Sequence, residues 1–148
     1  MPEVILIAAD HRGFPLKSKL DAWLSQHGYT PKDLGTHSED RCDSIDYAVK
    51  MAAELAAHPD QRGILICGTG NGIAMAANRF HSVYAALCFT AEMARLAREH
   101  NDSNVLALGA NVISEQTALD CVDVFLKTKF LGGRYAERRA KLMALGGL

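Results

Sequence analysis

The amino-acid sequence predicts an α/β domain in which five parallel strands form a doubly wound sheet. Apolar runs without polar alternation recur along the chain, and such runs are typical of strands that are covered on both faces of a parallel sheet. Segments with the apolar spacing of helices separate these runs, which is the order expected of strand-helix-strand units. The sequence contains no internal repeat, linker or low-complexity segment, so residues 1–148 are predicted to form a single domain.

The first half of the chain predicts two strands and two helices. The apolar run Val4–Ala9 is the first strand, and a polar turn then leads into a helix that admits Pro15 in its first turn. One face of this helix carries apolar residues at helical spacing, namely Leu16, Leu20, Trp23 and Leu24. Gly28 ends the helix, Thr30–Leu34 is a short second strand, and a helix from about Ser44 to Ala57 follows a polar segment.

The second half of the chain predicts three strands and four helices. In order, they are a strand ending at Cys67, a helix at Ile73–Asn78, a strand at Val83–Cys88, a helix ending at His100, a strand at Val105–Leu108, a helix ending near Lys127 and a basic helix at Tyr135–Leu145. Thr90 and Ser114 stand just before two of these helices, and their hydroxyl groups are suited to cap the helix N-termini.

The composition is ordinary for a globular protein, with 49% hydrophobic residues, 22% charged residues and a formal net charge of −1. This balance does not indicate nucleic acid or an anionic membrane as a partner. The sequence reaches Asp10 too soon for a signal peptide, and no apolar run approaches membrane-spanning length, so we expect a soluble cytoplasmic protein. The four widely spaced cysteines are expected to be reduced, and neither they nor the histidines have the spacing of a metal site.

The stretch Gly63–Arg79 is predicted to contain the active-site loop. Cys67 ends the third strand, and Gly68, Gly70 and Gly72 follow it before the next helix. Backbone N–H groups in a glycine loop that opens a helix hold negative charge without any cationic side chain. The same field stabilises the thiolate of a cysteine at the entrance of the loop, so Cys67 is the leading candidate for a base or a nucleophile.

Individual positions exclude three familiar glycine motifs. A dinucleotide-binding fingerprint would need a glycine where the chain has Ile73. A P-loop would continue with Gly-Lys-Ser or Gly-Lys-Thr, whereas the chain continues with Gly72-Ile73-Ala74. A low-molecular-weight cysteine phosphatase would need an arginine at this same position. The loop is therefore not predicted to bind a nucleotide or to form a phosphocysteine.

The candidate residues divide between two edges of the predicted sheet. Asp10, His11 and Cys67 lie at the carboxyl ends of strands, where open parallel sheets bind their ligands. His100 instead ends a helix and precedes the fifth strand, which places it at the opposite edge. If His100 and Cys67 serve one site, His100 must come from a second chain, and the sequence then predicts a homodimer with a shared site.

Two arginines in the C-terminal segment are suited to bind a phosphate group. Arg134 and Arg138 are one helical turn apart, so both guanidinium groups lie on one face of the helix. Arg139 and Lys141 add to this positive patch, and His11 is a possible third contact to the phosphate. A merely solvated basic helix is the alternative interpretation.

Together these segments resemble the family of type B ribose-5-phosphate isomerases and galactose-6-phosphate isomerases. The matching segments are Asp10-His11-x-Gly13-Phe14, Cys67-Gly68-Thr69-Gly70-Asn71-Gly72, His100-Asn101-Asp102 with Asn104-Val105, and Gly133-Arg134 with Arg138. They occur in the family's order and extend over nearly the whole chain. The resemblance implies a Rossmann-like fold, a homodimer that can pair into tetramers, and an enzyme that uses no metal or cofactor.

The resemblance also implies a role for each matching position. Cys67 matches the base that moves a proton between C1 and C2 of the opened sugar, His100 matches the acid that opens the ring, and Asp10 matches the carboxylate beside the ring oxygen. Thr69 matches a hydroxyl that helps move protons between O1 and O2. The loop that stabilises the enediolate is formed by Gly68, Gly70, Asn71 and Gly72. The positions that hold the substrate are His11, Asn101, Arg134 and Arg138.

Two positions depart from the family pattern. Ser44 stands where ribose-phosphate members often have a tyrosine, for which Tyr47 is a partial substitute, and Asn111 stands where many relatives have a phosphate-binding arginine. Some relatives use a glutamate after the loop as the base, but Ile73 occupies that position here. The resemblance implies an aldose-ketose isomerase that interconverts ribose 5-phosphate and ribulose 5-phosphate. The alternatives are a hexose 6-phosphate or tetrose 4-phosphate as substrate, or a sugar-phosphate-binding protein without turnover.

Overall fold

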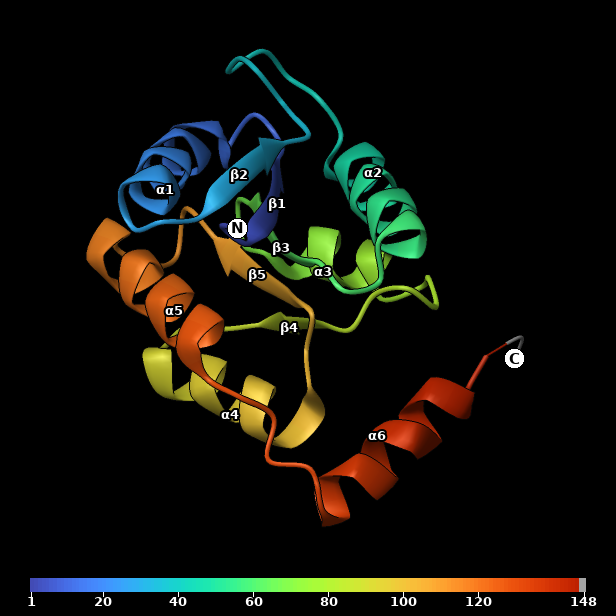
Figure 1. The fold of residues 1–148 in the computed structure, drawn as a ribbon. Coiled ribbons are helices and arrows are strands. Elements are labelled where there is room, and N and C mark those ends of the chain that lie inside the picture. Colours follow the sequence, from blue (N-terminus) through green and yellow to red (C-terminus); the bar gives the residue numbers. More distant parts are fainter. Residues whose placement is uncertain (147–148) are drawn as a thin grey trace.

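A computed structural model describes residues 1–146 and confirms the predicted five-stranded, all-parallel sheet (Figure 1). The strands lie in the order β2-β1-β3-β5-β4. The elements are β1 (Val4–Ala9), α1 (Phe14–Gln26), β2 (Thr30–Asp33), α2 (Ser44–Ala57), β3 (Arg62–Cys67), α3 (Asn71–Ala77), β4 (Ala85–Leu87), α4 (Ala91–Asn101), β5 (Val105–Gly109), α5 (Glu115–Lys127) and α6 (Arg134–Ala144). Residues 147 and 148, which the predicted domain includes, lie outside the described part of the chain.

Helices cover both faces of the sheet, as a doubly wound fold requires (Figure 1). The helices α1, α4 and α5 pack on one face, and α2 and α3 pack on the other. Alternate residues of β1 point into these two layers: Ile5 and Ile7 face α1, whereas Leu6 and Ala8 face α2. All four side chains are fully buried, which is why the strand is apolar at every position.

Hydroxyl side chains begin two of the helices, as the sequence predicts. Thr90 accepts a hydrogen bond from the N–H of Met93, and Ser114 accepts one from the N–H of Thr117, both at 3.1 Å. Each bond satisfies a backbone donor that has no partner inside its own helix, and a cap of this kind stabilises the fold by about 1 kcal/mol. The residues at which α4 and α5 begin are therefore determined by side chains that are close in sequence.

The fourth strand is shorter than the sequence predicts, spanning Ala85–Leu87 rather than Val83–Cys88. The side chain of Asn78 bonds both the N–H of Ala85, at 2.7 Å, and its carbonyl oxygen, at 2.9 Å. The side chain of Asn104 accepts a further bond from the N–H of Tyr84 at 2.8 Å. These side chains bind the backbone of Tyr84 and Ala85, and the pairing of β4 with β5 begins only at Ala85.

An ion pair between a buried lysine and a partly exposed carboxylate ties α1 to the end of β2. Lys17 is 1% exposed, and its Nζ lies 2.5 Å from Oδ2 of Asp33. Desolvation of the ammonium group is costly, and the paired carboxylate offsets that cost. Lys17 lies beside the apolar stripe of α1, and the spacing of that stripe gives no sign that this lysine is buried.

The topology brings the ends of three strands to one place. The strand order reverses between β1 and β3, because the chain winds from β1 to β2 on one side and crosses to β3 on the other. The register pairs Ala9 with Ile66, and Cys67 with Gly109. The carboxyl ends of β1, β3 and β5 therefore meet at the edge where sheets of this kind bind ligands.

The last helix lies outside the two layers. In Figure 1, α6 extends away from the sheet and touches the rest of the fold near the end of α4. None of its residues is buried. Within residues 1–146, no helix combines the length and the apolar character needed to span a bilayer.

Candidate active site

The glycine loop holds the thiol of Cys67 in contact with a backbone amide. Cys67 is the last residue of β3 and is 5% exposed. Its Sγ accepts a hydrogen bond from the N–H of Gly70 at 3.1 Å. An N–H group directed at the sulfur stabilises the thiolate, which is the form that acts as a base or a nucleophile.

One loop glycine is required by its backbone conformation, and a second lies close to two side chains. Gly70 has a φ of +83°, and a Cβ at this position would lie 2.4 Å from Cδ1 of Leu87. At Gly68, a Cβ would lie 3.0 Å from both Cδ of Arg12 and Nδ2 of Asn111. A larger residue at Gly70 would therefore be strained, whereas at Gly68 the side chains of Arg12 and Asn111 would have to shift slightly.

The other cysteines have different surroundings. Cys88 and Cys121 lie in the core beneath α4 and α5, and burial raises the pKa of Cys88 to about 12 and that of Cys121 to about 11. These thiols stay protonated and inert at neutral pH. Cys42 is half-buried and lies beside the ring of His11.

Asp10 is placed next to Cys67 by the pairing of β1 with β3. Its backbone N–H donates to the carbonyl oxygen of Ile66 at 3.1 Å, so it directly follows the sheet. Its Oδ1 accepts hydrogen bonds from the N–H groups of Arg12 and Gly13, both at 3.0 Å. The carboxylate is 7% exposed and is held at the start of α1, with Oδ2 left for another partner.

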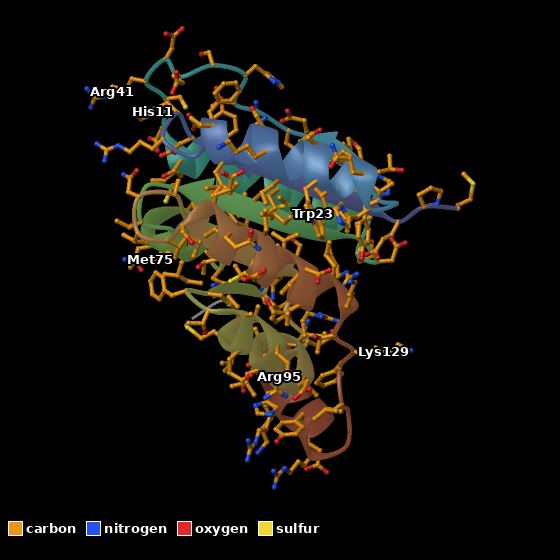
Figure 2. All side chains as sticks on the ribbon, turned by 90° about the vertical axis from the view of Figure 1, so that its left-hand side faces the viewer. His11, Trp23, Arg41, Met75, Arg95 and Lys129 are labelled. Atoms are coloured by element: carbon orange, nitrogen blue, oxygen red, sulfur yellow. The ribbon has the colours of Figure 1, made fainter. Side chains whose placement is uncertain are left out.

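His11 lies beside an open cleft at the same edge of the sheet. Its Nδ1 lies 3.2 Å from both the backbone nitrogen and the carbonyl oxygen of Cys42, so the backbone of Cys42 holds the ring while Nε2 is left for another partner. The cleft has a volume of about 960 Å³. Its lining residues are Asp10, His11, Arg12, Glu39, Arg41, Cys42, Asp43 and Ser44. Figure 2 shows His11 and Arg41 close together at this end of the molecule.

Several residues of the cleft were not predicted as site residues. Arg12 and Arg41 both line it, and Arg12 also lies against the glycine loop. Arg12 occupies the variable position of the Asp10-His11 motif, which was the available signal, whereas nothing in the polar segment around Arg41 marked it. Ser44 faces the loop, because its Oγ lies 3.7 Å from a Cβ built at Gly72.

Tyr47, the expected partial substitute for the tyrosine that Ser44 replaces, packs beside Gly35. Its ring packs against Gly35, where a built Cβ would lie 2.8 Å from Cε1 of the ring. The Nζ of Lys50 lies over the same ring, 5.0 Å from its centroid. Tyr47 therefore takes part in the packing between α2 and the segment after β2, and its role as a partial substitute stays a prediction.

The remaining loop residues are exposed. The hydroxyl oxygen of Thr69 accepts a hydrogen bond from the N–H of Asn71 at 3.2 Å, which leaves the hydroxyl proton free to be donated. Thr69, Asn71 and Gly72 all face solvent. Their open side is where a ligand of the loop would lie.

A second cluster forms where α4 ends and α6 begins. The ring of His100 stacks on that of Tyr135, with the centroids 4.3 Å apart and the planes 8° from parallel. The guanidinium carbons of Arg134 and Arg138 lie 5.1 Å and 5.8 Å from the centroid of the Tyr135 ring. The exposed Asn101 follows directly in the chain.

Arg139 does not join the positive patch that the sequence predicts. Its Nε donates to the carbonyl oxygen of Asn101 at 2.8 Å, and its Nη2 donates to that of Asp102 at 3.3 Å. Its guanidinium carbon lies 3.4 Å from the centroid of the Tyr84 ring. Arg139 therefore attaches α6 to the end of α4.

The two clusters of one chain lie apart. Cys67 pairs with Gly109 at the end of β5, whereas His100 precedes Val105 at its start. At about 3.3 Å per residue, β5 alone separates the two levels by about 13 Å. Figure 2 likewise shows His11 at one end of the molecule and α6 at the far end. One chain thus carries two half-sites: the loop half-site (Asp10, His11, Cys67–Gly72) and the helix half-site (His100, Asn101, Arg134, Arg138).

The loop half-site is suited to acid-base chemistry on an anionic or electron-rich ligand, because a thiol, a carboxylate and backbone donors converge there. The helix half-site is suited to bind a phosphate, since its two guanidinium groups are exposed and share one face. Within residues 1–146, no group of three or more histidine, cysteine or acidic side chains is arranged to hold a metal ion.

Comparison with known proteins gives one consistent family. The profile described as ribose/galactose isomerase matches residues 5–142. Ribose-5-phosphate isomerase B of Escherichia coli strain K12 is 40% identical over 141 residues, which cover 95% of this chain and 95% of that protein.

Solved structures agree with this similarity. The ribose-5-phosphate isomerase B of Clostridium thermocellum has a TM-score of 0.92 and 45% identity, with 95% of each chain covered. The ribose-5-phosphate isomerase B of Mycoplasma genitalium, solved with bound ribulose 5-phosphate, has a TM-score of 0.92 and 38% identity, with 97% of this chain and 95% of that chain covered.

Proposed function

Because this chain belongs to the ribose/galactose isomerase family, we propose that it interconverts aldose and ketose phosphates, with ribose 5-phosphate and ribulose 5-phosphate as its substrate pair. The reaction moves a proton between C1 and C2 through an enediolate and needs no cofactor. The observation that carries the proposal is the buried thiol of Cys67, held 3.1 Å from the N–H of Gly70 beside the carboxylate of Asp10.

Cys67 is the proposed base. Its thiolate removes the proton from C2 of the opened aldose and returns it to C1. The charge that develops on the substrate oxygens needs donors already in place, and the backbone of Gly68–Gly72 supplies them. One such donor contributes about 3 kcal/mol to the stability of the transition state. The free hydroxyl proton of Thr69 is suited to exchange with O1 and O2.

Ring opening comes before proton transfer when the substrate is an aldose. An acid must protonate the ring oxygen while a base accepts the proton of the C1 hydroxyl. We assign the acid to His100 and place Asp10 beside the ring oxygen and hydroxyls, where its Oδ2 is available. The phosphate would be held by Arg134, Arg138 and the imidazole of His11. Asn101 is assigned to the sugar hydroxyls.

The site is completed by a second copy of the chain. The half-sites of one chain lie at different levels of the sheet, so His100 of one protomer would meet Cys67 of its partner in a symmetric dimer. Exposed apolar residues beside the loop support such a contact: Met75, Phe89, Met93 and Val112 are 39–71% exposed. Figure 2 shows Met75 along the same edge as His11. Further pairing of dimers into tetramers is compatible with this arrangement.

All four cysteines are free, which is typical of proteins in reducing compartments. We therefore place the enzyme in the cytoplasm.

The substrate is tested by adding the protein to a panel of sugar phosphates in deuterated water and following the protons at C1 and C2 by NMR. We expect ribose 5-phosphate to exchange its C2 proton and to form ribulose 5-phosphate. Exchange confined to a hexose 6-phosphate would show that a hexose phosphate is the substrate. The small side chain of Ser44, which faces Gly72, would leave room for a larger sugar. Saturable binding without exchange would identify a binding protein and refute the enzyme.

A further inference from the structure

Tyr135 lies at the centre of the helix half-site, although no role has been assigned to it so far. Its ring stacks on His100, with the two planes within 8° of parallel. The same ring carries the guanidinium groups of Arg134 and Arg138 within 6 Å of its centroid. The Nη2 of Arg134 also donates to the hydroxyl of Tyr135 at 3.2 Å. One aromatic ring thus touches the proposed acid and both proposed phosphate ligands.

The stack is the contact that orients the imidazole. His100 is half-buried in the last turn of α4, and in the described part of the chain no hydrogen bond holds either of its ring nitrogens. Without the tyrosine face, the side chain would be free to change its rotamer. With the face in place, the ring plane is fixed and both nitrogens remain available to a substrate.

Tyr135 is itself held firmly by the same end of α4. Arg139 lies one helical turn further on the same face of α6, and it donates to the carbonyl oxygens of Asn101 and Asp102. On the other side, the N–H of Leu131 donates to the carbonyl oxygen of Glu99 at 3.1 Å. The face of α6 that carries Tyr135 is therefore fixed to α4, while Arg134 and Arg138 point to solvent.

We propose that Tyr135 is a positioning residue for ring opening: it holds the imidazole of His100 in the plane needed to protonate the ring oxygen, in register with the arginines that hold the phosphate. The proposal rests on the proposed isomerase function. It predicts that loss of the aromatic face slows the step in which the furanose opens. The proton transfer by Cys67 should be spared, because that thiol belongs to the other half-site.

The two directions of the reaction separate these steps. Ribose 5-phosphate is a furanose and must open before it reacts. Ribulose 5-phosphate has its O5 blocked by the phosphate and is already open, and the aldehyde that forms from it closes in solution. The comparison requires stopped-flow measurements at enzyme concentrations so high that spontaneous opening cannot keep the free aldehyde at equilibrium. In this regime the forward rate depends on ring opening by the enzyme.

The variants are Tyr135→Leu, which removes the stack, and Tyr135→Phe, which keeps it and removes only the hydroxyl. For Tyr135→Leu we expect the forward rate per enzyme to fall roughly tenfold, because a small misplacement of an acid has a large effect on rate. The reverse rate should fall less than about twofold. Tyr135→Phe should keep the wild-type ratio of forward to reverse rates, with a modest rise in KM in both directions from the lost bond to Arg134.

Equal loss in both directions for Tyr135→Leu would overturn the proposal, as would an unchanged forward rate or a Phe variant as impaired as the Leu variant. The NMR shifts of the His100 ring protons give a readout that needs no turnover. The ring current of Tyr135 should move them upfield in the wild type and in Tyr135→Phe, but not in Tyr135→Leu. A wild-type chain that isomerises no sugar phosphate would refute the proposed function instead, and these shifts would still show whether Tyr135 orients the ring.

Discussion

Replacing Gly70 by alanine tests the geometry of the loop without removing any reacting group. Gly70 has a φ of +83°, and an alanine Cβ would lie 2.4 Å from Cδ1 of Leu87 and 3.0 Å from the carbonyl carbon of Leu108. The Leu87 side chain can move, but the backbone at Leu108 belongs to β5 and is fixed. The left-handed conformation alone costs an alanine about 1–2 kcal/mol.

Adding the backbone contact, we expect Gly70→Ala to lower the free energy of unfolding by about 2–3 kcal/mol. The matched control is Gly72→Ala, two residues further on. There the Cβ would meet only Oγ of Ser44, at 3.7 Å, and the φ is not positive. Because Gly72 lies within α3, alanine should leave the stability unchanged or raise it by about 0.5 kcal/mol.

Urea unfolding at one fixed protein concentration measures both changes, since stability of an oligomer depends on concentration. If the two variants differ by less than about 0.5 kcal/mol, the strain assigned to Gly70 is wrong. The turnover of Gly70→Ala gives a second readout. Its N–H would shift away from Sγ of Cys67, so kcat should fall about tenfold or more even in fully folded protein.

Three further predictions concern the half-sites and the core. Cys67→Ala should abolish turnover while sparing binding, and His100→Ala should abolish turnover of ribose 5-phosphate where ring opening by the enzyme limits the rate. Under that condition, random exchange of the two variants should restore about a quarter of wild-type activity, because half the dimers then hold one intact site of two; no recovery after verified exchange would refute the shared site. Arg134→Ala and Arg138→Ala should each weaken binding of ribose 5-phosphate about tenfold or more in calorimetry, because each removes a charge-assisted bond of about 1.5 kcal/mol or more. Binding of unphosphorylated ribose should not change. Unchanged affinity for ribose 5-phosphate would show that these arginines do not bind the phosphate. Lys17→Ala removes the cation beside a partly solvated carboxylate in β2 and should lower the unfolding free energy by about 1–3 kcal/mol in urea titrations. A change near zero would mean that this ion pair is not stabilising.

The sequence predicts the fold well where the signal is local. The apolar run of β1 and the hydroxyl caps of α4 and α5 are confirmed, because burial on two faces and capping leave direct traces in neighbouring residues. The family resemblance is likewise confirmed by the match over residues 5–142. The predicted length of β4 is wrong, because the side chains of Asn78 and of Asn104, which is 20 residues from Tyr84, hold the start of that strand.

The site shows the same division. Cys67 and the loop glycines are predicted from the order strand, cysteine, glycine, and Asp10 is predicted from its place after the first strand. The structure places them at one edge of the sheet. Arg139 is misassigned, since helical spacing shows which residues share a face but not which face meets the end of α4. For the same reason the stack of Tyr135 on His100 has no signal in the sequence. The roles proposed for these residues stay predictions until the variants above are measured.

The separation of thiol and imidazole within one protomer has a consequence for the life of the enzyme. In the proposed dimer, a newly translated polypeptide cannot convert sugar until it binds a second one, and each dissociation of a dimer inactivates two active sites. Specific activity would then decline on dilution although every side chain is intact. A surface mutation that only weakens dimer formation would therefore have the same effect in a cell as the loss of a catalytic residue.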